Sequence, residues 1–500
     1  MKIKRGLVIV LIVLISVFFG YSTAICREKA SVRSLMQIYS NVLSYIQMYY
    51  VDEKNPSDLV ESSIKGMVGD LDPFSEFLNP EESEEFSIAT TGKFGGIGAQ
   101  IGIRDNWVTI IAPIEGTPAY RAGLVAGDRI VEIDGKSTEG MRVNDAVKLL
   151  RGQPGTKVTV KIYRPLSQKE FTVDLVRDII FIDPIPYSDV LQGKIGYVRI
   201  TDFQQGLTEE FTAVIDTLRR KGAESFIIDL RGNPGGLLHE AVDLLGLFFD
   251  PGTLVVYTRG RTPDNNFDYR TRGTGTYRSN PVIVLVDKGS ASASEIVAGA
   301  FQDWDRGVIL GDTTFGKGSV QRVFKLSEGY ELKLTTAKYY TPSGRCIHRP
   351  ERKDTLKEDT ATYYTKLLNK PVYGKGGIAP HVVVKQELVS TFTQEIYPHF
   401  FGFAVEYRTK YSSYSGINTE IITQFKEYLR RNKVKFNDAD FDKNIDQIKK
   451  LLDAEISEKF YGSRGRYRQL IREDKTIQKA VEVLHNCRTI NELRAYISKI

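Results

Sequence analysis

The feature that most constrains the fold is the segment from 282 to 322, in which short apolar runs alternate with loops and a helical pattern. Residues 282–286 form a continuous apolar run, which is typical of a fully buried strand. A loop of small residues follows at 289–294, then helical spacing of apolar residues from 296 to 304, and a second apolar run at 308–310. This order of strand, helix and strand predicts an α/β fold.

Two loops of this segment carry residues that suit catalysis. Ser290, Ser292 and Ser294 precede the helix, and Lys317 lies between two glycines after the second apolar run. Enzymes of the α/β class place a nucleophile and a base at such strand ends, where the amides of a helix N-terminus point at developing negative charge. The alternative is that one serine only caps the helix and that the lysine lies in a surface turn.

A glycine-rich loop at 231–236 (RGNPGG) joins an apolar strand, 225–230, to a predicted helix at 237–248. A glycine pair in this position offers backbone amides to an oxyanion. His239 is the rival base in this region, although its place in the first helical turn is that of an ordinary polar residue. Asp229 and Arg231 form either a structural pair or a part that shapes the site.

Residues 88–177 have the pattern of a separate unit. The segment 94–101 is a glycine-rich loop that runs into an alternating strand, and a helix is predicted from Val143 to Leu150. A glycine loop can also cradle phosphate, but GGIG lacks the lysine of a P-loop and does not open a helix.

Composition limits the remaining function classes. A chain of 500 residues has room for two to four domains, and its net charge of +6 is dispersed, which does not favour nucleic-acid binding. The five histidines and three cysteines lack metal-ligand spacing, so we expect neither a metal nor a cofactor. Cys346 and Cys487 admit a disulfide in an oxidising compartment.

The N-terminus predicts export. Residues 1–25 combine three early basic residues with an apolar run from Leu7 to Phe19, as in a signal peptide or a membrane anchor. Cys26 suggests a lipoprotein, but Ile25 stands where small residues are expected. Helices are predicted at 31–51 and 58–68, and in the tail at 417–432, 440–460 and 474–499.

At SASASEI (290–296) and TFGKGSVQ (314–321) the chain resembles the carboxy-terminal processing peptidases, also called tail-specific proteases. These are PDZ-containing serine peptidases with a Ser-Lys dyad. The resemblance implies that Ser292 is the nucleophile, that Lys317, 25 positions on, is the base, and that Gln321 orients the lysine. It also implies that the amides of Gly236 and Ala293 form the oxyanion hole.

The resemblance extends to the unit at 88–177, which is similar to a PDZ domain. It implies that the amides of Gly95, Gly96, Ile97 and Gly98 take the C-terminal carboxylate of a peptide that adds as a strand. A PDZ domain that serves only as a spacer is the alternative. At 377–381 (GIAPH) the chain has His381 where the family commonly carries aspartate, a position that we interpret as structural.

The implied fold is an α/β, crotonase-like (ClpP/crotonase type) core with an inserted PDZ domain and helical N- and C-terminal regions. The expected parts are an N-terminal signal or anchor, a helical segment, the PDZ domain, the Ser-Lys peptidase core and a C-terminal helical region, at 1–25, 31–87, 88–177, 178–385 and 386–500.

The implied function is a serine-type endopeptidase of exported proteins, selected by their accessible C-termini, in the periplasm or on the outer face of the inner membrane of a bacterium. Membrane anchorage and homo-oligomer contacts through the helical ends belong to this expectation. The alternative of a non-catalytic PDZ scaffold does not explain the presence of Ser292, Lys317 and Gly236. An acyl-transfer enzyme on a crotonase-like fold is disfavoured because coenzyme A is cytosolic.

Overall fold

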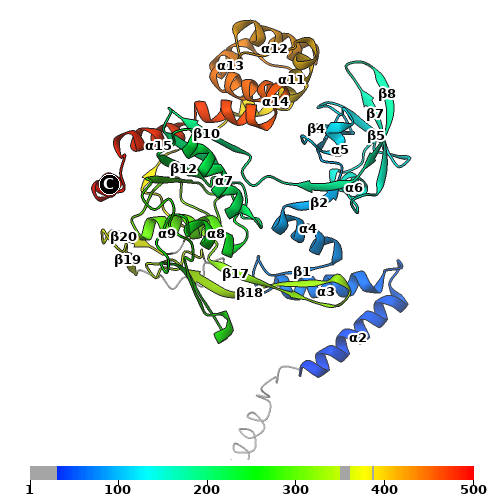
Figure 1. Ribbon diagram of the computed structural model, residues 1–500. Coiled ribbons are helices and arrows are strands. Elements are labelled where there is room, and N and C mark those ends of the chain that lie inside the picture. Colours follow the sequence, from blue (N-terminus) through cyan, green and yellow to red (C-terminus); the bar gives the residue numbers. More distant parts are fainter. Residues whose placement is uncertain (1–30, 350–360, 375, 386–387) are drawn as a thin grey trace, which may run out of the picture. The chain divides into compact units, whose positions relative to one another are not determined.

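The computed structural model describes residues 31–349, 361–374, 376–385 and 388–500 (Figure 1). The chain divides into two compact units, residues 1–77 and 78–500. The predicted leader and Cys26 lie outside the described residues. Among the residues that are described, no helix is both long enough and apolar enough to cross a bilayer.

In its described residues the first unit contains two helices, α2 (Val32–Tyr49) and α3 (Pro56–Gly69), which confirm the predicted helices. Ser31 caps α2 and Asn55 caps α3. Tyr39 Oη and Ser63 Oγ lie 2.7 Å apart and link the two helices. Strand β1 (Glu76–Leu78) lies at the boundary of the units.

The second unit begins with α4 (Pro80–Thr91) and a small antiparallel sheet in the order β3-β4-β5-β7-β8. Val108, Ile110, Ile130, Val160 and Ile162 fill its core. A separate two-stranded ladder joins β2 to β9. The elements are β2 (Lys93–Gly96), β3 (Ala99–Arg104), β4 (Trp107–Pro113), α5 (Pro118–Arg121), β5 (Arg129–Ile133), β6 (Lys136–Ser137), α6 (Val143–Leu150), β7 (Lys157–Arg164), β8 (Lys169–Val176) and β9 (Asp178–Phe181).

A six-stranded sheet in the order β10-β11-β12-β15-β16-β21 forms the centre of the second unit. Strand β10 runs antiparallel to β11, and every other neighbouring pair is parallel. The strands are β10 (Tyr187–Leu191), β11 (Ile195–Arg199), β12 (Ser225–Asp229), β15 (Val282–Val286), β16 (Val308–Gly311) and β21 (Val382–Val383). β12, β15 and β16 are buried throughout, which explains the apolar runs at 226–228, 282–286 and 308–310.

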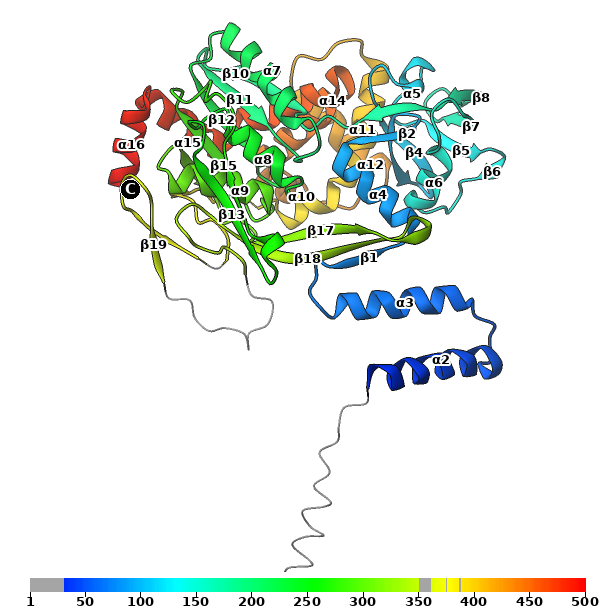
Figure 2. The same cartoon turned by 60° about the horizontal axis from the view of Figure 1, so that its bottom comes forward.

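Helices cover both faces of this sheet (Figure 2). On one face α7 (Leu207–Arg220), α8 (Leu238–Leu245) and α9 (Ala293–Asp303) enclose a core that includes Phe211, Phe226 and Phe301. On the other face α15 (Lys475–Asn486) and α16 (Ile490–Lys499) pack on Ile227, Ile283 and Leu285. Alternate residues of each strand face opposite layers, so both helical layers position the same strand ends.

A second sheet is built mainly from long antiparallel strands. β13 lies between β14 and β18, and β17 pairs with β18. The elements are β13 (Leu254–Gly260), η1 (Pro263–Asn265), β14 (Phe267–Arg270), β17 (Ser319–Lys325), η2 (Ser327–Gly329), β18 (Glu331–Tyr340) and the separate pair β19 (Thr362–Tyr364) and β20 (Pro371–Tyr373).

The C-terminal region is helical, as predicted, but two of its boundaries differ. The segment predicted as one helix at 474–499 is α15 and α16, because Thr489 caps a new helix by accepting from the amide of Glu492. The segment at 440–460 divides into two helices. The remaining helices are α10 (Thr391–Ile396), α11 (Pro398–Lys410), α12 (Thr419–Arg431), α13 (Asp438–Lys443) and α14 (Ile445–Arg472), which is interrupted at Gly462.

The disulfide that the sequence admits between Cys346 and Cys487 is not formed. Cys487 is buried among the apolar side chains that join α15 and α16 to the central sheet. Cys346 follows β18 in a half-buried loop. The thiol of Cys487 therefore contributes to helix packing rather than to a cross-link.

His381 has a structural position at the edge of the central sheet. Its Nδ1 accepts a hydrogen bond from the Ile309 amide at 2.9 Å, and its own amide donates to the Ile309 carbonyl at 2.9 Å. Burial, and then the positive charge of Arg345, lower the pKa of His381 to about 4. The neutral imidazole thus accepts a bond that an aspartate could also accept.

We expect His381 to make stability depend on pH between about 4 and its ordinary pKa of 6.5. In this window the unfolded chain binds a proton that the folded chain does not, so the free energy of unfolding rises with pH, by at most about 3 kcal/mol. Denaturant unfolding of the wild type and of His381→Asn, compared from pH 4 to 8, measures this contribution. Parallel curves for the two proteins would contradict it.

Candidate active site

Three loops meet at one edge of the central sheet. They follow the carboxyl ends of β12, β15 and β16, which are neighbouring parallel strands. Loop 230–237 carries the glycine pair, loop 287–292 the serines and loop 312–318 the lysine. Because parallel strands end at the same edge, segments nearly ninety residues apart come together, as the sequence predicts for the serine and lysine loops.

The structure distinguishes the three serines by their partners. Ser290 Oγ donates to the Leu230 carbonyl at 2.8 Å, and Ser294 Oγ donates to the Asn233 carbonyl at 3.0 Å. Both residues are fully buried, whereas Ser292 is half-buried. Within the described residues, no hydrogen bond donated by the Ser292 hydroxyl is found. Ser290 and Ser294 therefore tie their loop to its neighbour, and Ser292 is the serine that remains available.

Ser292 has a strained backbone at the start of α9. Its φ of 53° and ψ of −112° lie in a region that L-residues rarely adopt, at a cost of about 1–3 kcal/mol. The Tyr339 hydroxyl donates to its carbonyl at 3.2 Å. A sharp turn of this kind between strand and helix is how α/β enzymes expose a nucleophilic serine.

The glycine pair packs directly against the serine turn. A Cβ atom on Gly235 would lie 2.8 Å from Ser292 Cβ, and one on Gly236 would lie 2.5 Å from the Phe203 carbonyl oxygen. Only glycine permits this approach, and both residues have positive φ. In the described part of the chain, the amides of Gly236 and Ala293 donate to no protein acceptor. These two groups are therefore available to an anion.

Glu295 joins the serine and lysine loops. Its Oε2 accepts from the amides of Ser292 and Lys317, each at 2.9 Å. Its Oε1 accepts from the Gly316 amide at 2.8 Å and from the Thr314 hydroxyl at 2.5 Å. The backbone nitrogens of Ser292 and Lys317 are therefore at most twice 2.9 Å, or 5.8 Å, apart.

The Glu295 carboxylate is fully buried in the first turn of α9. Burial raises its pKa, and the four hydrogen bonds oppose that rise. An ionised carboxylate is an acceptor only, so four donors saturate it. The positive end of the helix dipole also favours the charge at this position.

Lys317 is half-buried between Gly316 and Gly318 in the loop before β17. Gln321 lies in β17, where its amide nitrogen donates to Ser319 Oγ and to Thr335 Oγ1, each at 3.0 Å. These bonds fix the orientation of the Gln321 side chain. Its carbonyl oxygen is the acceptor that remains after both amide protons are used.

Two further groups hold the glycine loop beside the serine loop. Asp287 Oδ1 accepts from the amides of Gly232, at 2.7 Å, and Gly289, at 2.9 Å. The Asn233 carbonyl accepts from the Ala291 amide at 3.0 Å as well as from Ser294 Oγ. The two loops are therefore joined through side chains and backbone.

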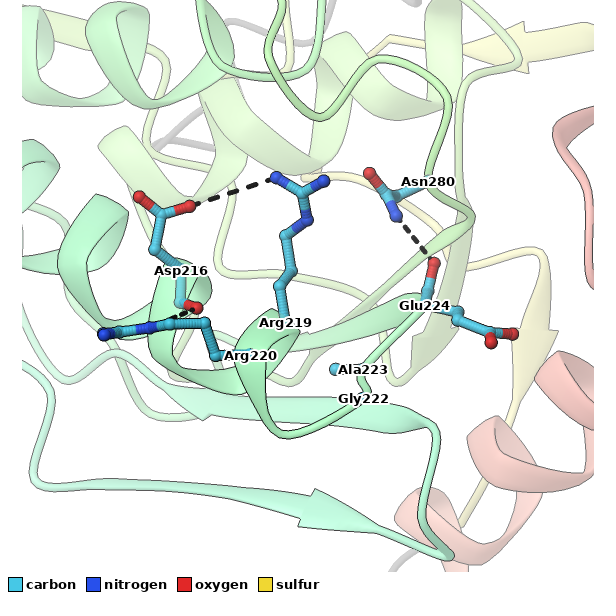
Figure 3. A pocket seen from close by; sticks show the side chains of 7 residues that line it. All are labelled: Asp216, Arg219, Arg220, Gly222, Ala223, Glu224 and Asn280. Atoms are coloured by element: carbon cyan, nitrogen blue, oxygen red, sulfur yellow. Dashed lines mark hydrogen bonds and ion pairs between the residues drawn. The ribbon is translucent and has the colours of Figure 1, made fainter.

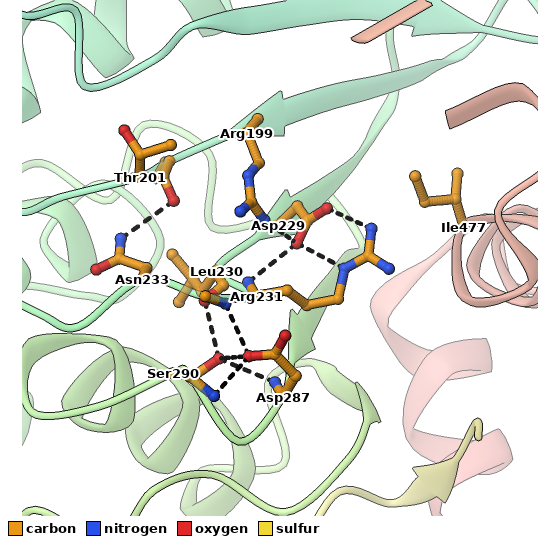
Figure 4. Close-up of polar contacts among 12 residues, drawn as sticks. Arg199, Thr201, Asp229, Leu230, Arg231, Asn233, Asp287, Ser290 and Ile477 are labelled. Carbon is orange, nitrogen blue, oxygen red and sulfur yellow. Dashed lines mark hydrogen bonds and ion pairs between the residues drawn. The ribbon is translucent and has the colours of Figure 1, made fainter. Parts of the chain in front are cut away.

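Asp229 and Arg231 form a buried structural pair (Figure 4). Arg231 donates to both Asp229 oxygens, at 2.9 and 2.6 Å, and Arg199 adds a bond of 2.8 Å. Burial opposes ionisation of Asp229, but the arginines outweigh it and lower the pKa to about 2. His239 is exposed in the first turn of α8, so it has the ordinary polar position that the sequence predicts.

The glycine loop at 94–98 borders a small pocket of about 90 Å³. Ala99, Ile101, Val147 and Leu150 supply its apolar lining, and Phe94 and Arg151 also border it. The Arg151 guanidinium lies 4.8 Å from the centre of the Phe94 ring. The Ile97 and Gly98 amides are not used by any acceptor among the described residues. The pocket can hold a small apolar group beside these two donors.

Another surface hollow lies at the end of α7 (Figure 3). Its polar groups are engaged with each other, since Asn280 donates to the Glu224 carbonyl at 2.7 Å and Arg219 lies 4.0 Å from Asp216. It includes none of the catalytic candidates. Elsewhere in the described residues, no cluster of histidine, cysteine and carboxylate side chains is arranged to hold a metal.

Known protein families match three parts of this chain. The pattern of peptidase family S41 matches residues 194–359, that of a PDZ domain matches 109–164, and that described as "Probable PDZ-protease, C-terminal helical domain" matches 437–484. The carboxy-terminal processing protease CtpA of Bacillus subtilis is 33% identical over 444 residues, which cover 87% of this chain and 91% of the relative. This chain belongs to the carboxy-terminal processing proteases of family S41.

A second relative, the carboxy-terminal-processing protease of Bartonella bacilliformis, is 38% identical over 313 residues, or 62% of this chain and 71% of the relative. Among solved structures, the photosystem II D1 C-terminal processing protease is 27% identical, with a TM-score of 0.39 and coverage of 72% of this chain and 95% of that one. The match to family S41, the match to a PDZ domain and the helix-covered sheet make this chain a mixed α/β protease with a PDZ domain.

Sequence reasoning assigned no role to Glu295, Asp287 or Asn233 in this protease. Glu295 stands three residues after Ser292, a spacing typical of a capping box, which is a signal for its bond to the Ser292 amide. Its bonds to Gly316 and Lys317 have no local signal. They depend on β15 and β16 being neighbours.

We expect Glu295→Gln to lower kcat at least tenfold. A glutamine offers one acceptor oxygen and brings a donor nitrogen to face amide protons, so buried donors lose their partners at about 1–3 kcal/mol each. Steady-state proteolysis at a temperature well below the melting transition measures the loss.

Glu240→Gln is the matched control. Glu240 is also buried in a first helical turn and accepts from two amides, of Gly206 and Thr208, and from the Thr208 hydroxyl. Among the described residues, none of its side-chain hydrogen bonds goes to the serine or the lysine loop. It should lose comparable thermal stability and retain kcat. Equal kcat losses in both variants would show that Glu295 contributes to stability alone and not to the geometry of the site.

Proposed function

We propose that this protease cleaves peptide bonds by covalent catalysis with Ser292 and Lys317. Ser292 Oγ attacks the scissile carbonyl while the neutral Lys317 amine takes its proton. The amides of Gly236 and Ala293 stabilise the oxyanion. Lys317 then returns the proton to the leaving amine, and a water molecule hydrolyses the acyl-enzyme by the same route.

The bond of Glu295 Oε2 to both backbone amides is the observation that carries this proposal. It supports a close approach of the two loops without using either reacting side chain. The engaged hydroxyls of Ser290 and Ser294 support Ser292 among the three serines. The unused amides of Gly236 and Ala293 flank the same turn.

Lys317 must be deprotonated to act as a base, although a lysine ordinarily titrates near 10.4. Partial burial between two glycines is consistent with desolvation, which disfavours the charged form. Gln321, with its nitrogen held by Ser319 and Thr335, is proposed to orient the lysine through its carbonyl oxygen.

The PDZ domain is proposed to select substrates by their C-termini. The unused amides of Ile97 and Gly98 can bind a terminal carboxylate, and the adjoining apolar pocket can take the last side chain. Gly95 and Gly96 belong to β2 and bring the backbone close to this site. The substrates are then unfolded or tail-exposed proteins.

The wider setting belongs to the same proposal. The core is crotonase-like, with the PDZ domain at 88–177, the peptidase core at 178–385, and helical regions before and after them at 31–87 and 386–500. Export to the periplasm or the outer membrane face, with or without anchorage, depends on residues 1–25. The exposed apolar side chains of α2, such as Leu35, Ile38 and Val42, support a homo-oligomer contact, which sedimentation of the whole chain tests.

Ser292→Ala should abolish proteolysis, whereas Ser294→Ala should retain turnover within about tenfold, because it loses only a structural hydrogen bond of about 1 kcal/mol. Lys317→Ala and Lys317→Arg should both be inactive, since a guanidinium stays protonated. His239→Ala should keep most of its activity. Digestion of an unfolded protein measures all five variants.

The wild-type kcat/KM should rise with pH as Lys317 loses its proton. Asp202 lies beside Gly236, and burial raises its pKa to about 6, so the profile is repeated in Asp202→Asn to separate the two titrations. A rate independent of pH in both proteins, or turnover by Ser292→Ala, would contradict the dyad.

Amidation of a substrate's C-terminus should weaken its binding roughly ten- to a hundredfold, because hydrogen bonds to a charged acceptor contribute about 1.5–3 kcal/mol. Cleavage of one unfolded protein with free and amidated termini, below saturation, measures this effect. Equal rates would leave the PDZ domain as a spacer.

Gly96→Val should imitate amidation. A Cβ atom there would lie 3.0 Å from the Phe94 ring, which borders the pocket. Gly98 is unsuitable because its Cβ would lie 2.2 Å from Thr117 Cβ. Hydrolysis of a small ester that does not need the PDZ domain is the control, and it should be unchanged.

A further inference from the structure

The C-terminal helices reach the catalytic loops through one carboxylate. Asp474 caps α15, where its Oδ1 accepts from the amides of Thr476, at 2.9 Å, and Ile477, at 3.0 Å. Its other oxygen, Oδ2, accepts from Arg231 Nη1 at 2.8 Å. A residue near the end of the chain is thus bound to Arg231, the second residue after β12.

Arg231 is held from both sides. Its Nε and Nη2 form the two-pronged pair with Asp229, and Nη1 is the nitrogen left for Asp474. The Arg231 side chain is 11% exposed and that of Asp474 is 23% exposed, so water screens this pair only in part. The pair therefore differs from the exposed ion pairs of the protein surface.

The loop that Arg231 begins ends at Gly236, one of the proposed oxyanion donors. The Arg231 amide also donates to Asp229 Oδ1, at 3.0 Å, so Asp229 holds both the side chain and the backbone of Arg231. Asp287 holds the next amide, that of Gly232. A change in the position of Arg231 is therefore passed to a short loop fixed at both ends.

Asp474 caps a helix that is packed against the central sheet. Behind it, α15 packs Ile477, Ala480 and Leu484 against the sheet residues Ile227 and Leu285. Those two belong to β12 and β15, the strands that lead into the glycine and serine loops. The N-terminus of α15 and the two loops are therefore held in place by the same strands.

We propose that Asp474 is a positioning residue for peptide hydrolysis. It fixes Arg231 and, through it, the loop that presents the Gly236 amide, which makes the C-terminal helices part of the catalytic unit. This inference rests on the proposed function of Ser292 and Gly236. The alternative is that Asp474 only caps α15.

Asp474→Asn separates the two roles, because asparagine caps helices as well as aspartate but lacks the charge. The expected result is a five- to tenfold loss of kcat, with KM for a peptide substrate within twofold. Misplacement of an oxyanion donor weakens transition-state binding without affecting ground-state binding. A peptide boronic acid, which forms a tetrahedral adduct with the nucleophile, should bind five- to tenfold more weakly.

Glu482→Gln is the matched control. Glu482 lies on the same helix and pairs with Lys479 at 2.7 Å on an exposed surface. It should change neither kcat nor boronic-acid affinity. Asp474→Glu, which keeps the charge, should recover most of the activity. In an Arg231→Lys background, Asp474→Asn should add little further loss.

Unchanged kcat and boronic-acid affinity in a folded Asp474→Asn protein would overturn the inference, as would an equal loss in Glu482→Gln. Failure of the proposed function is distinguishable from this outcome. In that case Ser292→Ala would remain active and the boronic acid would not inhibit the wild type.

Discussion

The proposed active site depends on one buried carboxylate. Glu295 accepts four hydrogen bonds, and two of them come from the amides of Ser292 and Lys317. Burial of a charge is costly, and saturation of its acceptor sites together with the helix N-terminus offsets that cost. The carboxylate fixes the backbones of Ser292 and Lys317 and leaves their side chains for the proposed chemistry. A strained turn at Ser292 is tolerated because these bonds hold it.

The parallel sheet makes this arrangement accessible. β12, β15 and β16 end at one edge, and each leads into a loop of the site. The loops are joined by Asp287, by the Asn233 carbonyl and by Ser290 and Ser294, so these two serines have structural roles. Helices on both faces bury the strands, and the C-terminal helices add a charged link from α15 to Arg231.

The PDZ segment, the S41 segment and the C-terminal helical segment follow one another along the chain. Individual residues show how this chain stabilises that arrangement. His381, at the edge of the central sheet, is one such residue. Its neutral imidazole accepts a hydrogen bond from the Ile309 amide, so this edge of the sheet is satisfied without a negative charge. Before the segment that matches a PDZ domain, the amides of Ile97 and Gly98, which no acceptor among the described residues uses, lie beside an apolar pocket, as the proposed binding of a peptide terminus requires.

The sequence by itself determined the buried strands, most helices, the serine and lysine loops and the family, because these depend on local periodicity and on short motifs. Helix ends such as the break at Thr489 depend on side-chain caps that a periodic pattern averages over. Only the tertiary structure decided which serine is available, that Glu295 joins two loops and that Asp474 reaches Arg231. Each of these depends on which strands are neighbours, and residues far apart in the chain carry no local trace of that contact.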